Sequence, residues 1–187
     1  MSRIGVLALQ GDVREHVNIL ESLDADALEV KKPDELLEID ALILPGGEST
    51  TIAKMAVRFG LIEPIRSVID EGLPVYGTCA GMILLASTIS DSDQPVIGAL
   101  DVVVRRNAYG RQNESFEAPL DVEGLDSPFP GVFIRAPWVE KVGADVEVLA
   151  AIDDHPVMVR QGRTLATSFH PELTDDGRIH EMLLELI

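Results

Sequence analysis

The chain has 187 residues, 46% of them hydrophobic, and carries 32 acidic against 15 basic side chains for a net charge of −17. This length suits one compact domain over residues 1–187, and the composition excludes a disordered chain. The charge excludes a nucleic-acid-binding face, no apolar run approaches the ~20 residues of a membrane-spanning helix, and a single cysteine excludes an internal disulfide, so we expect a cytoplasmic protein with no membrane or nucleic-acid partner.

The first half of the chain alternates strand and helix patterns. We expect strands at 3–9, 27–30, 41–44 and 73–76, and helices at 13–23, 49–59, 61–71 and 82–87. Ser49 or Thr50 is the expected cap of the second helix. Such alternation is typical of βαβ units. We therefore predict a three-layer α/β/α fold with a mostly parallel central sheet, of the flavodoxin-like type.

The second half is richer in short strand patterns. These fall at 101–105, 131–135, 146–151, 157–160 and 164–168, and a helix is expected at 178–187. No repeat, low-complexity segment or linker divides the chain, which favours a single domain over its whole length.

The only cysteine lies at the junction between the strand at 73–76 and the helix at 82–87. The segment reads Gly77-Thr78-Cys79-Ala80-Gly81, so the sulfur stands on a sharp turn where flanking glycines relieve crowding. The start of the next helix favours a thiolate. A lone cysteine is more often a small buried hydrophobe, but the Gly-x-Cys-x-Gly frame at such a junction favours a nucleophile.

A nucleophilic cysteine needs a base, and the base needs an orienting group. His170 ends an apolar strand in Ser168-Phe169-His170-Pro171-Glu172, and Glu172 is placed to hold one ring nitrogen. The alternative is a His-Pro turn with a solvated glutamate. We expect His16 and His180 to be surface residues of helices, and His155 to lie in a turn. No Cys/His set has metal-ligand spacing, so no metal site is predicted.

Two other segments can serve a substrate. Pro45-Gly46-Gly47 follows a predicted buried strand, and its glycines allow a backbone N–H to turn inward as one arm of an oxyanion hole. The arginines of 105–112 and 133–137 can bind a free carboxylate. The alternatives are an ordinary turn before a capped helix and surface ion pairing with the many acidic residues.

These features together resemble class I, triad-type glutamine amidotransferases, which share Gly-x-Cys-x-Gly, a late His-Pro-Glu and an early Pro-Gly-Gly. Longer stretches narrow the resemblance to the glutaminase subunits of pyridoxal 5′-phosphate synthases, and the resemblance spans nearly the whole chain. These stretches are residues 8–16, 45–51, 106–112, 115–117 and 133–137.

The resemblance implies a class I glutamine amidotransferase fold and a role for each matching residue. Cys79 is the implied nucleophile, His170 the acid–base and Glu172 its orienting group. The implied activity is hydrolysis of L-glutamine to glutamate and ammonia through a cysteine thioester, with no cofactor. The ammonia would pass to a barrel-shaped synthase subunit in a large hetero-oligomer. The implied glutamine site comprises Gly47, Glu48, Ser49, Arg106, Ile134 and Arg135, and we expect the backbone N–H groups of Gly47 and Ala80 to form the oxyanion hole.

Small departures from the family pattern and three rival readings remain. The departures are Ala108-Tyr109 and the polar stretch at 90–94, and we expect neither to touch the site. The nearest rival is another amidotransferase subunit, such as that of imidazole glycerol phosphate synthase, which the 10–16 and 106–112 segments disfavour. A stress protein or peptidase with a cysteine on an elbow lacks the late His-Pro-Glu, and an intact Cys-His-Glu set disfavours a non-catalytic regulatory domain.

Overall fold

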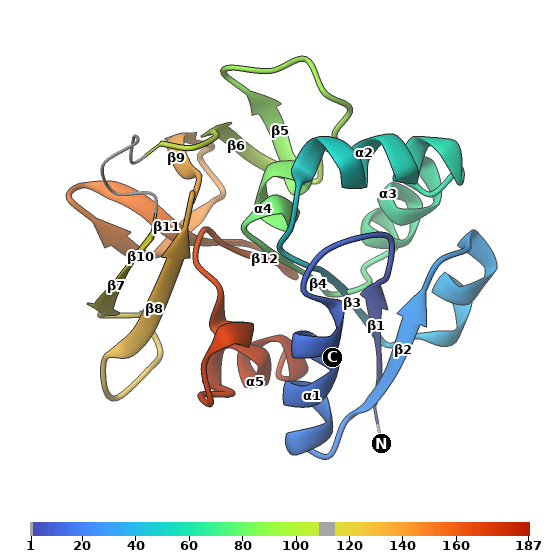
Figure 1. Cartoon of the computed structure of the whole chain (residues 1–187), viewed down its shortest axis with the longest axis horizontal. Coiled ribbons are helices and arrows are strands. Elements are labelled where there is room, and N and C mark those ends of the chain that lie inside the picture. The colour runs from blue at the N-terminus through green and yellow to red at the C-terminus, as the bar shows by residue number, and fades with distance from the viewer. Residues whose placement is uncertain (1, 109–114) are drawn as a thin grey trace.

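A seven-stranded sheet in the order β10-β11-β12-β4-β3-β1-β2 forms the centre of the computed structural model (Figure 1), which describes residues 2–108 and 115–187. Four neighbouring pairs are parallel, and only β10–β11 and β11–β12 are antiparallel, so the predicted mostly parallel sheet is confirmed. Its strands are β1 Arg3–Leu7, β2 Asp26–Val30, β3 Ala41–Leu44, β4 Val75–Thr78, β10 Glu147–Ile152, β11 His155–Gln161 and β12 Thr164–Thr167.

Helices cover both faces of this sheet, as a three-layer fold requires (Figure 1). They are α1 Val13–Ser22, α2 Ser49–Arg58, α3 Ile62–Asp70, α4 Ala80–Leu85 and α5 Arg178–Leu184, with 3-10 turns η1 Pro33–Glu38 and η3 Pro171–Leu173. The expected helix at 82–87 is wrong in its last residues, because the chain turns into a strand at Ala86. The turn η1 was not predicted.

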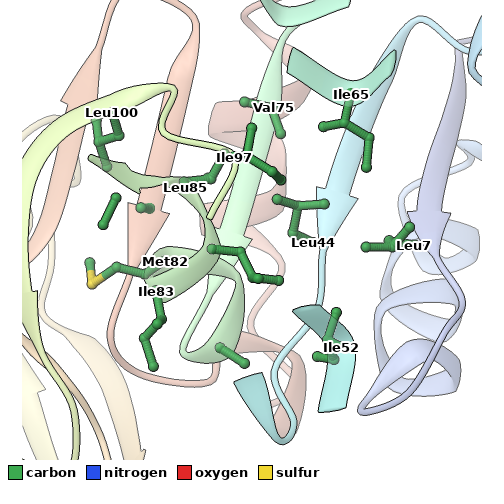
Figure 2. Packing of buried hydrophobic residues seen from close by; sticks show 14 of the residues in the cluster. Leu7, Leu44, Ile52, Ile65, Val75, Met82, Ile83, Leu85, Ile97 and Leu100 are labelled. Carbon is green, nitrogen blue, oxygen red and sulfur yellow. The ribbon is translucent and has the colours of Figure 1, made fainter. Parts of the chain in front are cut away.

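Alternation along the buried strands produces two hydrophobic cores. In β3, Leu42 and Leu44 pack with Ile52 of α2 on one face, whereas Ile43 packs with Leu20 of α1 on the other. Figure 2 shows the first core, in which side chains from β1, β3, β4, α2, α3 and α4 meet. The period of two in each strand therefore decides which helices lie on which side of the sheet.

The middle of the chain forms two smaller sheets beside the main one. One joins β5 Ala86–Ile89, β6 Leu100–Arg105 and β9 Trp138–Val142, and the other is the hairpin of β7 Ser115–Leu120 and β8 Phe129–Ile134. β5, β7 and β9 were not predicted as strands. Within the described part of the chain, no helix has the length and hydropathy that crossing a bilayer requires.

Four adjacent parallel strands bring their carboxyl ends to one edge of the sheet. In spatial order these are β12, β4, β3 and β1. Each is followed by a segment singled out in the sequence: 168–172 after β12, 77–81 at the end of β4, 45–51 after β3 and 8–16 after β1. Segments far apart in the chain thus meet where ligands gather in doubly wound folds.

Candidate active site

Cys79 stands on a strained turn between β4 and α4. It has a φ of 47°, in the left-handed region that side chains rarely adopt, and its N–H donates to the carbonyl of Thr167 at 2.8 Å. A Cβ on Gly81 would lie 2.0 Å from the carbonyl oxygen of Leu44. The glycine is therefore required by the close approach of α4 to β3, and the predicted elbow is confirmed in its local geometry.

His170 and Glu172 form a buried pair at the same edge. Nδ1 of His170 lies 2.7 Å from Oε1 of Glu172, and each residue is 4% exposed. The backbone N–H of His170 donates to Val132 of β8 at 2.8 Å, which ties the pair to the hairpin. Nε2 of His170 is buried with no hydrogen-bond partner in the described part of the chain. The glutamate thus occupies one ring nitrogen and leaves the other for proton transfer.

Asp12 is a second carboxylate beside the ring, and the sequence did not single it out. Its Oδ2 lies 3.4 Å from Nδ1 of His170. Asp12 is the N-cap residue of α1, yet its side chain makes no capping hydrogen bond. An aspartate at this position normally caps its own helix. Here the carboxylate is instead within ion-pair range of the imidazole.

Charge on the ring is strongly favoured despite its burial. Burial lowers the pKa of His170, but interactions with Asp12, the Cys79 thiol and Glu172 outweigh it and raise the pKa to about 12. Burial also raises the pKa of Glu172, against the opposing effect of the His170 ring. The direction for His170 follows from two carboxyl groups facing one imidazole, which is therefore an imidazolium near neutral pH.

Asp12, His170 and Glu172 are also the described residues whose ligand atoms come close enough together to hold a metal, within 4.8 Å of one another. The geometry fits a hydrogen-bonded ion pair better, because Nδ1 of His170 is already bonded to Glu172 at 2.7 Å. We assign no metal to this group.

A small cavity of about 90 Å³ opens beside the cysteine. All six residues expected to bind glutamine line it, and Ile83 and Asn107, which the sequence reasoning missed, complete the wall. The full lining is Gly47, Glu48, Ser49, Cys79, Ile83, Arg106, Asn107, Ile134 and Arg135. Ala80 begins α4 directly after the cysteine, where the first N–H groups of a helix have no intrahelical partner.

The Gly46–Gly47 turn packs against the loop that follows β1. The N–H of Asp12 donates to the Gly46 carbonyl at 3.1 Å, and the N–H of Glu48 donates to Oε1 of Gln10 at 2.8 Å. Gly47 has a φ of 148°, and a Cβ there would lie 2.8 Å from Gln10 Oε1. The loop after β1 therefore sets the orientation of the turn that was expected to supply an oxyanion donor.

The helix after this turn is not capped as expected. Glu48, rather than Ser49 or Thr50, is the N-cap of α2, and its carboxylate accepts from the N–H groups of Thr50 and Thr51. Hydrogen bonding, first from the Thr50 hydroxyl, lowers the pKa of Glu48 to about 2. Its carboxylate is therefore used to cap the helix. The sequence did not predict this role, because helix caps are usually residues with shorter side chains.

The polar stretch at 90–94 does contact the site, contrary to expectation. Oε1 of Gln94 accepts from the Ser49 hydroxyl at 3.1 Å and from Arg106 at 3.3 Å, and Asp91 lies 3.4 Å from Arg106. Two lining residues are therefore bridged by one amide. Arg135 has no ion-pair partner within 2–108 and 115–187, so its guanidinium is the less committed of the two arginines. The other departure from the family pattern is Ala108-Tyr109, and its Tyr109 lies outside the described residues.

His16 and His180 are buried, which corrects their expected surface position. Both are 0% exposed, and they meet behind Glu172. His16 precedes the buried Ile19 and Leu20 by three and four positions on α1, so it belongs to the apolar stripe of that helix. The periodicity contained this signal, but the polarity of histidine hid it. His155 begins β11 and stacks on Trp138, with ring centroids 3.7 Å apart.

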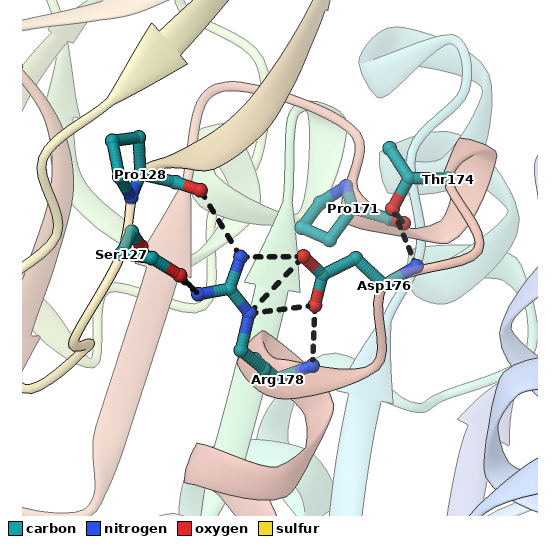
Figure 3. A network of polar contacts seen from close by, with 6 residues as sticks. All are labelled: Ser127, Pro128, Pro171, Thr174, Asp176 and Arg178. Atoms are coloured by element: carbon teal, nitrogen blue, oxygen red, sulfur yellow. Dashed lines mark hydrogen bonds and ion pairs between the residues drawn. The ribbon is translucent and has the colours of Figure 1, made fainter.

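The segment after Glu172 is held in place by a polar network (Figure 3). Arg178 pairs with Asp176 at 2.6 Å and donates to the carbonyls of Ser127 and Pro128 at 2.9 Å and 3.1 Å. Thr174 donates to the Pro171 carbonyl at 2.8 Å. The turn that carries Glu172 is therefore fastened to the chain that leads into β8.

A cysteine on a strand–helix elbow, beside a buried His–Glu pair at the carboxyl edge of a doubly wound sheet, is the arrangement of the class I glutamine amidotransferases. The model of the SNO glutamine amidotransferase family matches residues 6–187. The chain therefore belongs to that family.

Relatives and solved structures agree with this membership. The chain is 62% identical to "Pyridoxal 5'-phosphate synthase subunit PdxT" of Streptomyces coelicolor, over 98% of this chain and 93% of that protein. It is 56% identical to the protein of the same name from Mycobacteroides abscessus, over 98% and 96%. A crystal structure of a glutamine amidotransferase superposes with a TM-score of 0.94 at 54% identity, covering 98% of this chain and 97% of that one. PurLQS from Thermotoga maritima, at a TM-score of 0.71, 18% identity and 99% coverage of both chains, shares the fold.

Proposed function

We propose that this chain is the glutaminase of a pyridoxal 5′-phosphate synthase, hydrolysing L-glutamine with Cys79 as nucleophile, His170 as acid–base and Glu172 as orienting group. Residues 1–187 form a single glutaminase domain. The observation that carries the proposal is the meeting of Cys79 and the His170–Glu172 pair at one sheet edge, beside a cavity that Arg135 borders. The names of the relatives supply the synthase assignment.

The reaction proceeds in two halves. The Cys79 thiolate attacks the side-chain carboxamide carbon of glutamine, and backbone N–H groups of Gly47 and Ala80 hold the oxyanion. Imidazolium His170 gives a proton to the departing nitrogen, ammonia leaves, and a γ-glutamyl thioester remains on the sulfur. His170 then takes a proton from water, which attacks the thioester and releases glutamate. Glu172 holds Nδ1 throughout, so Nε2 performs both transfers.

Substrate selection comes from the cavity wall. Arg135 binds the α-carboxylate of glutamine, and Arg106, held by Gln94 and Asp91, supports the wall beside it. Ile134 and the backbone of Gly47, Glu48 and Ser49 complete the binding site. No cofactor takes part.

The ammonia passes to a barrel-shaped synthase subunit. The partners belong to a large hetero-oligomer of the cytoplasm, which suits a chain whose single cysteine must stay reduced. Direct transfer of the free ammonia within a complex avoids its loss to water.

The test is a glutaminase assay of the full chain with and without its synthase subunit, following glutamate and pyridoxal 5′-phosphate together. We expect glutamine-dependent formation of both products in the complex. Glutamate release with no glutamine-dependent pyridoxal 5′-phosphate would refute the synthase assignment. Absence of glutamate release in the complex would refute the glutaminase itself.

A further inference from the structure

Two histidines that the proposed chemistry does not use lie buried directly behind the triad. His16 on α1 and His180 on α5 are both 0% exposed, and Nδ1 of His16 is 2.9 Å from Nε2 of His180. Tyr76 of β4 meets both rings edge-on, with centroids 6.5 Å from His16 and 5.8 Å from His180. Fully buried histidines are uncommon, because one ring nitrogen carries a proton that needs an acceptor.

His16 is the ring nearer to the proposed triad, and it lies next to groups that are linked to both Cys79 and His170. Nε2 of His16 lies 3.2 Å from the hydroxyl oxygen of Thr78 and 3.7 Å from Oε1 of Glu172. Thr78 directly precedes the nucleophile in the chain, and Glu172 orients His170. One imidazole thus contacts the strand end that carries the cysteine and the carboxylate that holds the base.

Hydrogen-bond accounting assigns the proton on each ring. Nε2 of His16 is within hydrogen-bond distance of Thr78 at 3.2 Å, and the acceptor-only carboxylate of Glu172 at 3.7 Å favours the tautomer that carries its proton on Nε2. Nδ1 of neutral His16 is then an acceptor, and Nε2–H of His180 donates to it. Nδ1 of His180 is buried with no partner in the described part of the chain. In this arrangement that orphan is a bare nitrogen, and neither ring of the pair has an N–H without an acceptor.

Burial keeps both rings neutral. It is the main cause that lowers the pKa of His16 well below its ordinary value, with smaller contributions from His180 and His170, and it lowers the pKa of His180 to about 4. A cation at His16 would compete with His170 for the charge of Glu172. A neutral ring turns the positive end of its N–H dipole toward the carboxylate, 3.7 Å away, without that competition.

We propose that His16 and His180 are positioning residues, a neutral imidazole pair that fixes Glu172 and Thr78 and thereby aligns His170 with Cys79. This role rests on the proposed function and extends the triad by two rings toward α5. Neither ring touches the cavity, so the pair acts on the chemical step rather than on glutamine binding.

Two substitutions of His16 distinguish loss of its Nε2–H donor from loss of the volume that its ring fills. His16→Gln places an amide nitrogen near the former Nε2 and keeps a donor toward Glu172, whereas His16→Asn places its amide near the former Nδ1 and leaves Glu172 without one. We expect kcat of His16→Gln to stay within about threefold of wild type and kcat of His16→Asn to fall at least about tenfold. KM for glutamine should stay within about twofold in both, since neither substitution alters the cavity.

The assay uses the full chain with its synthase subunit, and His155→Asn on β11 is the matched control for loss of an imidazole away from the site. A second readout is alkylation of Cys79 by iodoacetamide in the chain without its synthase subunit, where it is the single cysteine. Alkylation should slow in His16→Asn and not in His16→Gln. Equal kcat in the two variants, or a loss confined to KM, would overturn the positioning role.

A third variant decides the matter if His16→Asn does not fold. His180→Phe keeps a ring against Tyr76 but removes the N–H that fixes the His16 tautomer, so kcat should fall severalfold at constant KM. Wild-type kcat in His180→Phe would overturn the proposal. A wild-type complex that hydrolyses no glutamine would instead overturn the proposed function, whereas a fully active His16→Asn in an active system overturns only the imidazole pair.

Discussion

At the scale of single residues, half of the described non-glycine residues with positive φ line one cavity. Cys79, Asn107 and Arg135 line it, with φ of 47°, 47° and 44°, whereas Asp24, Asp153 and Asp154 lie elsewhere. Such conformations cost on the order of 1–3 kcal/mol each and persist only where neighbouring structure imposes them. The rest of the fold therefore holds Cys79 and the cavity wall in place before any substrate arrives.

Asp12 is expected to govern the alkaline limit of activity. Its carboxylate raises the pKa of His170, so the imidazolium persists to higher pH. In Asp12→Asn the ring should lose its proton at lower pH, and the alkaline limb of the kcat/KM profile should move down. Asp34→Asn, on an exposed part of η1, is the control. A profile unchanged from wild type would show that Asp12 does not act on the catalytic ring.

Arg135 is expected to bind the substrate carboxylate more directly than Arg106. Its exposed guanidinium lacks an ion-pair partner among the described residues, whereas Arg106 is held by Asp91 and Gln94. Arg135→Ala should raise KM for glutamine on the order of tenfold, equivalent to about 1.4 kcal/mol. Arg106→Ala should raise it less, and the exposed Arg58→Ala not at all. If KM is unchanged in both cavity variants, neither arginine binds the substrate carboxylate.

At the scale of elements, the turn after β3 and the loop after β1 behave as one unit. The N–H of Asp12 holds the Gly46 carbonyl, and Gln10 holds the N–H of Glu48. A Gly-Gly peptide can rotate at little steric cost. A synthase subunit that presses on the loop after β1 can therefore change the direction of the Gly47 N–H.

This coupling predicts that the isolated chain is a poor glutaminase. Removing one oxyanion donor costs roughly 10²–10³ in kcat, so saturating synthase should raise kcat by up to that factor. Gly47→Ala should abolish the rise, because its Cβ would meet Gln10 Oε1 at 2.8 Å. Gly60→Ala is the control, since that glycine also has positive φ but nothing within 4 Å of an added Cβ. Equal kcat with and without synthase would mean that the turn is preformed.

The elbow makes a prediction about stability. In Gly81→Ala the new Cβ would lie 2.0 Å from the Leu44 carbonyl oxygen, and backbone must move to relieve it. We expect a loss of roughly 1–3 kcal/mol in the free energy of unfolding by chemical denaturation. Gly177→Ala meets only the flexible side chain of Leu23, at 3.1 Å, and should cost less. A Gly81→Ala chain as stable as wild type would contradict the close packing of α4 on β3.

At the scale of the whole molecule, the sequence predicted well the features that a local pattern encodes. These patterns are the alternation of strand and helix segments and the glycines that flank the cysteine. The parallel strands β1, β3 and β4 and the elbow at Cys79 follow from local patterns. The contacts of Gln94 and the burial of His16 and His180 did not, because they arise from packing between segments far apart in the chain. β7 and β9 also escaped prediction, because charged side chains interrupt their apolar pattern, Glu117 in β7 and Glu140 and Lys141 in β9.

Glutamine hydrolysis is proposed to depend on one thiol, that of Cys79. The measurement that tests it most directly is the rate of glutamate release from glutamine by Cys79→Ala in the complete complex, with the melting temperature of the chain as control. We expect an unchanged fold and no release above background, with a loss nearly as severe in His170→Ala and a smaller one in Glu172→Ala. A folded Cys79→Ala chain that still releases glutamate at a rate near wild type would show that Cys79 is not the nucleophile.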